Sequence, residues 1–102
     1  MFKRSPKLVD VLGEVRGCAK EGNFLFRDHA LSRAGERQVT RPEVQYVLAI
    51  SGYHERSKDC FKEGDWRYAI RGKTLDRRDL RIVVVFDRDL IIVTVIDMDL
   101  GK

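Results

Sequence analysis

A histidine, a glutamate and two arginines lie at helical spacing in one short segment: His29, Arg33, Glu36 and Arg37. A helix would place all four on one face. Cleavage of RNA through its 2′-hydroxyl needs a base, an acid and cations that stabilise the charge on the phosphate. Histidine can act as base or acid near neutral pH, and arginine binds phosphate through paired hydrogen bonds. We therefore predict His29 and Glu36 as catalytic residues and Arg33 and Arg37 as phosphate ligands. The alternative is an ordinary solvated helix face.

A second group of cations follows a strand pattern over residues 66–73. Alternation places Trp66, Tyr68 and Ile70 on one face and Arg67, Ala69, Arg71 and Lys73 on the other. A sheet face with three cations would bind an RNA backbone by releasing counterions. We predict Arg71 as a catalytic residue, and Arg67, Lys73 and the nearby Arg81 as RNA or phosphate ligands. The alternative is an edge strand whose charges prevent aggregation.

The remaining aromatic residues, the second histidine and the second cysteine are less informative about function. Trp66 and Tyr68 either stack on bases or pack in the core, and their position beside apolar strands favours the core. His54 lies in a polar loop and is interpreted as solvated. Cys60 lies in the same loop, where Lys58 and Lys62 alone do not indicate a catalytic thiol.

The elements that must position these residues can be read from capping and periodicity. We take residues 1–102 as a single domain, with an N-terminal helix in 1–22, a helical part in 23–52, a loop in 53–65 and a β-meander in 66–98. Ser5-Pro6 predicts the start of the first helix, and Asp28 predicts the cap of a helix over 29–38. Thr40 and Glu43 form a capping-box pattern for the next helix. Residues 23–27 are either a short strand or an apolar lead-in, and the loop in 53–65 is either irregular throughout or begins with a short strand.

The predicted fold class is therefore α+β. Two to three helices precede an antiparallel β-meander of three to four strands. The connections between the last strands are too short for a parallel crossover, so neighbouring strands must be antiparallel.

Composition limits the function classes. The chain of 102 residues has a net charge of +4 and a pI of about 9.3, which permits contact with nucleic acid. We expect no metal and no cofactor, because Cys18, His29, His54 and Cys60 match no zinc spacing. No signal peptide or membrane-spanning run is evident, so we expect a cytoplasmic protein with reduced thiols. The sequence gives no indication of the oligomeric state.

Several segments resemble a known but uncharacterised family. They are Phe26–Thr40 (FRDHALSRAGERQVT), Val44 with Val47-Leu48, Tyr68–Lys73, 80–84 (LRIVV) and Val93–Ile96. This pattern is similar to a bacterial domain-of-unknown-function family that is grouped with the RelE/BrnT-like toxins of toxin–antitoxin modules. The resemblance covers roughly residues 24–97, and the first helix lies outside it.

The resemblance implies a toxin-like, metal-independent RNA endonuclease or translation inhibitor that acts on RNA or the ribosome. It implies a small antitoxin as partner, of zinc-finger or helix-turn-helix type. The positions of this sequence that match the family's pattern, and that the resemblance therefore implies as candidate site residues, are His29, Arg33, Arg37, Arg71 and Lys73. The alternative is a non-enzymatic RNA- or protein-binding module of the same fold.

Overall fold

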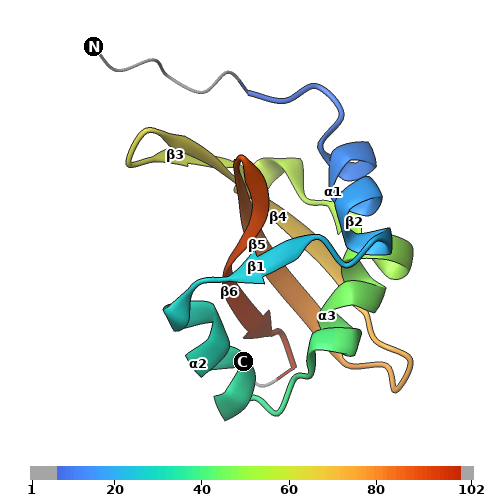
Figure 1. Cartoon of the computed structure of the whole chain (residues 1–102). Helices are drawn as coiled ribbons and strands as arrows, with labels where there is room; N and C mark the ends of the chain where they lie inside the picture. Colours follow the sequence, from blue (N-terminus) through green and yellow to red (C-terminus); the bar gives the residue numbers. More distant parts are fainter. Residues whose placement is uncertain (1–6, 100–102) are drawn as a thin grey trace.

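The computed structural model describes residues 7–99 and has an α+β architecture (Figure 1). The helical elements are α1 (Val11–Lys20), α2 (Asp28–Glu36), α3 (Arg41–Tyr46) with its π-helical continuation Val47–Ser51, and a 3-10 turn (Arg56–Lys58). The strands are β1 (Phe24–Phe26), β2 (Tyr53–His54), β3 (Cys60–Lys62), β4 (Asp65–Lys73), β5 (Asp79–Asp87) and β6 (Asp89–Asp97). The predicted fold class, helices followed by a β-meander, is confirmed.

The helix starts follow the available caps. Thr40 and Glu43 form the predicted capping box at the start of α3. The prediction for the first helix is wrong in its boundary, and Ser5-Pro6 lies outside the described residues. The helix begins at Val11, because the carboxylate of Asp10 accepts a hydrogen bond from the backbone N–H of Gly13 at 3.0 Å. Val9 precedes the helix and is 93% exposed.

The second helix is shifted toward the N-terminus relative to its prediction. Arg27 occupies the N-cap position without a side-chain hydrogen bond, and Asp28 is the first helical residue. A carboxylate in the first turn still favours the helix, because it lies near the positive end of the helix dipole. The helix ends at Glu36, and Gln38 has a positive φ of 54°, so the predicted continuation to 38 is wrong.

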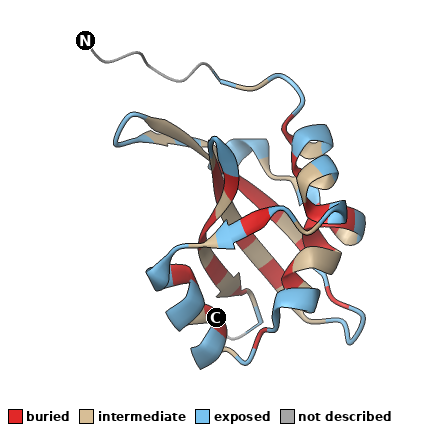
Figure 2. Cartoon of the chain, in the orientation of Figure 1, coloured by how far each residue is buried: buried red, intermediate tan, exposed pale blue. Residues whose placement is uncertain are grey.

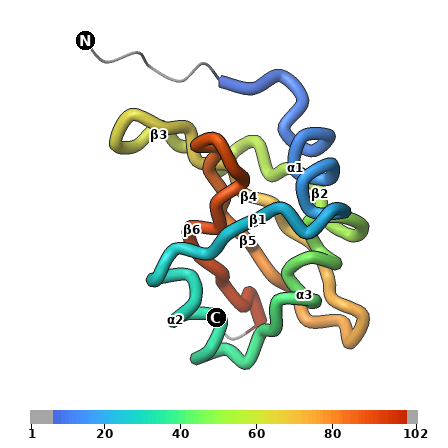
Figure 3. The backbone as a smooth tube through the Cα atoms, viewed as in Figure 1, coloured from blue at the N-terminus to red at the C-terminus, as the bar shows by residue number. Residues whose placement is uncertain are grey.

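Six strands form one mixed sheet. The order is β1-β6-β5-β4-β2, and β3 also pairs with β4. The β4–β5–β6 meander is antiparallel, as predicted. The segment 23–27 does contain a strand, and β1 pairs parallel with β6 (Phe24 opposite Leu90). Figure 3 shows β1 beside β6, although the two strands come from opposite parts of the chain.

The core lies between the helices and one face of the sheet. Every buried side chain of the described helices belongs to one apolar cluster with Ile70, Ile82 and Ile92. Figure 2 shows the buried residues in red along both the helices and the strands. Side chains that point the other way, such as Ala69 and Val85, are buried but lie outside that cluster. None of the described helices contributes a buried side chain to this second face, which we call the open face of the sheet.

Candidate functional site

Four charged side chains form a connected group on the open face. The guanidinium of Arg71 donates to both carboxylate oxygens of Asp79, at 3.1 and 2.7 Å. The guanidinium of Arg81 donates to both oxygens of Glu55, at 2.7 and 3.1 Å. Arg71 Nη1 also lies 3.6 Å from Glu55 Oε2, so the two pairs are joined. We call Glu55, Arg71, Asp79 and Arg81 the charged cluster.

Strand register explains why these residues meet. Arg71 of β4 lies directly opposite Arg81 of β5 and opposite Tyr53 of β2. Like charges opposite one another in a sheet are destabilising, so the row requires carboxylates beside it. Glu55 extends the β2 register, because its backbone N–H donates to Ala69 O at 2.8 Å. The carboxylates therefore offset a repulsion that the register itself creates.

Two glycines allow β2 to begin at the right place. A Cβ on Gly72 would lie 2.8 Å from the Cα of Gly52, so only glycine permits this close approach of the two backbones. Ser51 Oγ donates to Lys73 O at 2.7 Å and fixes the same junction. The end of the π-helical segment is thereby held against β4, and Tyr53 follows next to Arg71.

Ion pairing shifts the pKa values of the cluster. The hydrogen bond from Arg81, helped by the charges of Arg81 and Arg71, lowers the pKa of Glu55. The hydrogen bond from Arg71 lowers the pKa of Asp79 in the same way. The same hydrogen bonds raise the pKa of each arginine. All four groups are therefore charged near neutral pH.

Other polar groups border the charged cluster. Tyr53 is 53% exposed, and its phenol interacts electrostatically with both Arg71 and Arg81. Lys73 is exposed at the end of β4 and its charge contributes to the low pKa of Asp79. Arg67, earlier in β4, has its guanidinium 3.7 Å from the carboxylate of Glu63. An aromatic ring and an ammonium group thus lie next to the cluster.

The structure brings together only part of the predicted site. Arg71 and Lys73 follow the strand alternation predicted for β4, and Arg81 lies directly opposite Arg71 on the same open face. His29 lies on α2, whose buried residues Ala30 and Ala34 pack in the helix-side cluster. Arg71 follows the core residue Ile70 in β4 and points to the opposite face. The prediction that His29 and Arg71 form a single site is therefore wrong, because the sheet separates them.

The α2 group is itself loosely organised. His29 and Glu36 are exposed, and Glu36 pairs with Arg33 at 3.4 Å rather than with the histidine. Arg37 is half-buried, and its backbone carbonyl accepts a hydrogen bond from Arg78 at 3.0 Å. The four residues do share the helix, but Glu36 does not orient His29 as predicted.

His54 is not the solvated side chain that the sequence suggested. Its side chain is only 10% exposed, and Nε2 lies 2.7 Å from Oδ1 of the buried Asp59. Lys7 Nζ lies 3.1 Å from the other oxygen of Asp59. The β2 register places His54 opposite Ile70, so the ring turns toward the helices and contacts Tyr68 edge-on. This group joins the N-terminal segment to the sheet.

The aromatic residues of β4 belong to the interior. Tyr68 is 2% exposed, and its hydroxyl accepts a hydrogen bond from the backbone N–H of Leu8 at 2.9 Å. Trp66 is half-buried and contacts Phe61 edge-on. The core interpretation of Tyr68 is confirmed, and the exposed aromatic residue beside the cations is Tyr53.

Sequence reasoning missed Glu55 and Tyr53. Both lie in the polar stretch interpreted as loop, and the signal that could have found them is the alternation of Tyr53 and Glu55 around His54. Within residues 7–99, no group of three or more His, Cys, Asp or Glu side chains is arranged to hold a metal ion. In the same part of the chain, no helix is long and apolar enough to cross a membrane.

Comparison with known families places the chain in an uncharacterised group. Residues 26–97 match the family described as Domain of unknown function (DUF4258), and the protein belongs to that family. The match begins at the last residue of β1 and includes α2 and all the later strands. No curated protein and no solved structure matches the chain. The family membership predicted from the sequence is confirmed.

Proposed function

We propose that the protein is a cytoplasmic, metal-independent RNA endonuclease of the RelE-like toxin kind, with its active site at the charged cluster. The observation that carries this proposal is Glu55, which lies 2.7 Å from Arg81 and 3.6 Å from Arg71 on a sheet face that no described helix covers. A carboxylate base between two guanidiniums supplies two of the three groups that RNA transesterification needs.

The reaction follows from the positions of these groups. Glu55 takes the proton of the 2′-hydroxyl, whose oxygen then forms a bond to the adjacent phosphorus. Arg71 and Arg81 stabilise the charge that builds on the phosphate oxygens. The P–O5′ bond breaks, and the phenol of Tyr53 gives its proton to the leaving oxygen. The products are a 2′,3′-cyclic phosphate and a 5′-hydroxyl end, without any hydrolytic metal.

The other predicted ligands have secondary parts in this proposal. Lys73, and Arg67 earlier in the same strand, bind phosphates that flank the scissile one. His29, Arg33 and Arg37 lie on the helix side and take no part in the chemistry. A small antitoxin, of zinc-finger or helix-turn-helix type, would inhibit the enzyme, which would act on RNA, either free or at the ribosome.

Cleavage of a labelled single-stranded RNA in the presence of EDTA tests the proposal. The wild-type protein should cleave it, and the same sequence as DNA should stay intact because it lacks the 2′-hydroxyl. Glu55→Gln should lower kcat/KM by roughly 100-fold or more, the usual contribution of a general base. Glu36→Gln is the matched control, since it makes the same change in an exposed carboxylate on α2.

Two results would contradict the nuclease proposal. One is equal cleavage by wild type and Glu55→Gln, with circular dichroism showing that both are folded. The other is cleavage of the DNA strand at the rate of the RNA strand.

A non-enzymatic RNA-binding module is the second candidate. It is favoured by the pairing of both arginines with carboxylates and by the position of both described histidines away from the cluster. This candidate predicts RNA affinity that falls with salt and no cleavage by any variant. Binding with intact RNA after prolonged incubation would therefore favour it over the nuclease.

A further inference from the structure

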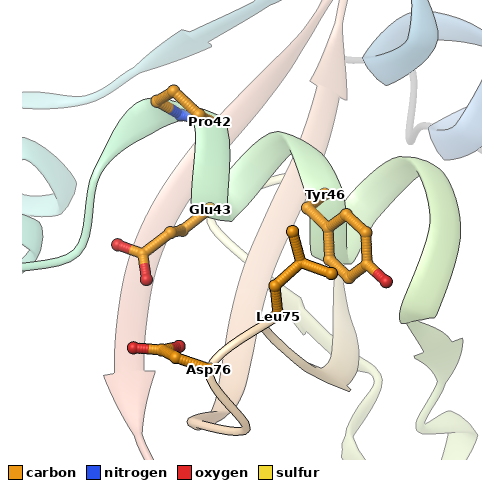
Figure 4. A pocket seen from close by; sticks show the side chains of 5 residues that line it. All are labelled: Pro42, Glu43, Tyr46, Leu75 and Asp76. Atoms are coloured by element: carbon orange, nitrogen blue, oxygen red, sulfur yellow. The ribbon is translucent and has the colours of Figure 1, made fainter.

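A groove lies on the helix side, between α3 and the turn that joins β4 to β5. Pro42, Glu43 and Tyr46 of α3 line it on one side, and Leu75 and Asp76 of the turn line it on the other (Figure 4). Its volume is about 210 Å³, enough for one large side chain of a partner. None of these residues belongs to the charged cluster.

The turn holds an apolar side chain in solvent. Leu75 is 81% exposed, although its neighbour Thr74 is buried. Three hydrogen bonds order the turn: Thr74 N–H to Arg78 O at 2.9 Å, Arg77 N–H to Thr74 O at 2.9 Å, and Arg78 N–H to Thr74 Oγ1 at 3.1 Å. Leu75 is therefore presented by an ordered backbone rather than by a loose loop.

Charge distinguishes the two ends of the groove. Figure 4 shows the carboxylates of Glu43 and Asp76 on the same side, and Leu75 beside the ring of Tyr46 on the other. Within residues 7–99, the side-chain hydrogen bonds and the ion pair of Glu43 all use Oε1, which contacts Thr40 and Arg78. The hydrogen bond from Thr74, together with the charge of Arg78, lowers the pKa of Asp76. Asp76 thus remains charged at neutral pH.

We propose that this groove docks a segment of a partner protein that carries an apolar side chain followed or preceded by an arginine or lysine. The apolar side chain would lie against Leu75 and Tyr46, and the cation would lie between Glu43 and Asp76. Charge complementarity selects this occupant. Arg78 pairs with one oxygen of Glu43 at 3.5 Å and also acts on Asp76, so one cation faces two carboxylates, and the remaining negative charge favours a cation over the phosphates of RNA. The inference is independent of the proposed nuclease activity, since it concerns other residues.

Selection from a random peptide library displayed on phage tests the groove. The full chain is the bait, and clones that also bind the Leu75→Asp variant are removed. We expect the remaining clones to share an aliphatic or aromatic residue with an arginine or lysine nearby. A fluorescently labelled peptide of that consensus should bind the wild type, and Leu75→Asp should weaken its affinity at least about tenfold.

Matched variants separate docking from general effects. Asp76→Asn should weaken peptide affinity by roughly two- to fivefold, the size expected for one exposed charge pair. Leu31→Asp should bind like the wild type, because this leucine is also exposed but lies on α2. Replacing the basic residue of the peptide by glutamate should abolish binding, and RNA cleavage or RNA binding should be unchanged by Leu75→Asp.

Three outcomes would overturn the docking proposal. The first is that no clone distinguishes the wild type from folded Leu75→Asp. The second is a consensus without a basic residue. The third is sedimentation data in which the wild type self-associates and Leu75→Asp does not, since a second copy of the chain would then occupy the groove.

Discussion

The open face of the sheet and the exposed side of α2 carry the same residue types but hold them differently. On the open face, Arg81 donates to both oxygens of Glu55, 26 positions away in the sequence. On α2, Arg33 lies 3.4 Å from Glu36, three positions away, and both side chains are well exposed. The first arrangement is fixed by strand register, whereas the second depends on two mobile side chains. Fixed charges are what electrostatic catalysis requires, so the comparison favours the open face as the site of chemistry.

The largest difference between the two regions should appear in stability. Arg81→Ala leaves the half-buried Glu55 with only its longer contact to Arg71, so we expect a loss of about 1–3 kcal/mol in the free energy of unfolding. Arg33→Ala removes an exposed ion pair and should cost less than about 0.5 kcal/mol. Chemical denaturation of both variants measures the difference. Equal losses would show that the open-face pair is no better organised than the helix pair.

Acid unfolding should also distinguish the carboxylates of the open face from Glu36 on α2. The pKa values of Glu55 and Asp79 are lowered in the folded state, so the unfolded chain binds protons first as the pH falls. Their stabilising contribution is complete above the ordinary carboxyl pKa values of about 4 and is lost as the pH falls through the lowered ones. Denaturation midpoints measured between neutral and strongly acidic pH should therefore fall less steeply for Glu55→Gln than for wild type. Glu36→Gln should follow the wild-type curve, and identical curves for all three proteins would contradict the expectation.

The salt dependence of RNA affinity should come from the cations of the sheet rather than from those of α2. Lys73→Ala removes one phosphate contact and should reduce the slope of log affinity against log salt by about 0.7 for a single strand. Arg37→Ala should leave that slope unchanged. Fluorescence anisotropy of a labelled RNA over a sodium chloride series provides the measurement. A reduced slope for Arg37→Ala alone would show that the RNA binds at α2 instead of the open face.

The smallest effect is expected at the histidine of α2. His29→Ala should change RNA cleavage by no more than about twofold, because the side chain lies across the sheet from the charged cluster, whereas loss of a true acid or base costs about 100-fold. Single-turnover cleavage by His29→Ala beside wild type gives the answer. A large loss of rate in a folded variant would restore the sequence hypothesis that His29 is catalytic.

Local patterns predicted the elements well, and long-range register explains the failures. The Thr40–Glu43 capping box and the alternation along β4 are each encoded within a few residues, and both were found. His54 and Glu55 were misread or missed because their environment depends on pairing with β4, which no local pattern shows. The start of α1 was misplaced because two competing caps exist, Ser5 and Asp10, and only tertiary structure selects between them. Alternation along β4 places Arg71 on the face opposite Tyr68, but the approach of Glu55 to Arg71 and Arg81 depends on the position of β2.

The parallel pairing of β1 with β6 has a consequence for the folding of the domain during synthesis. β6 is made after every other described element, yet it lies between β1 and β5 in the sheet. Until residues 89–97 have left the ribosome, β1 lacks its neighbour and α2 lacks the strand against which it packs. Pairings between distant segments also form slowly, because loop closure must precede the contacts that stabilise it. The part of the core between α2, β1 and β6 is therefore completed last, whereas the residues of the charged cluster and of the groove all precede β6 in the chain.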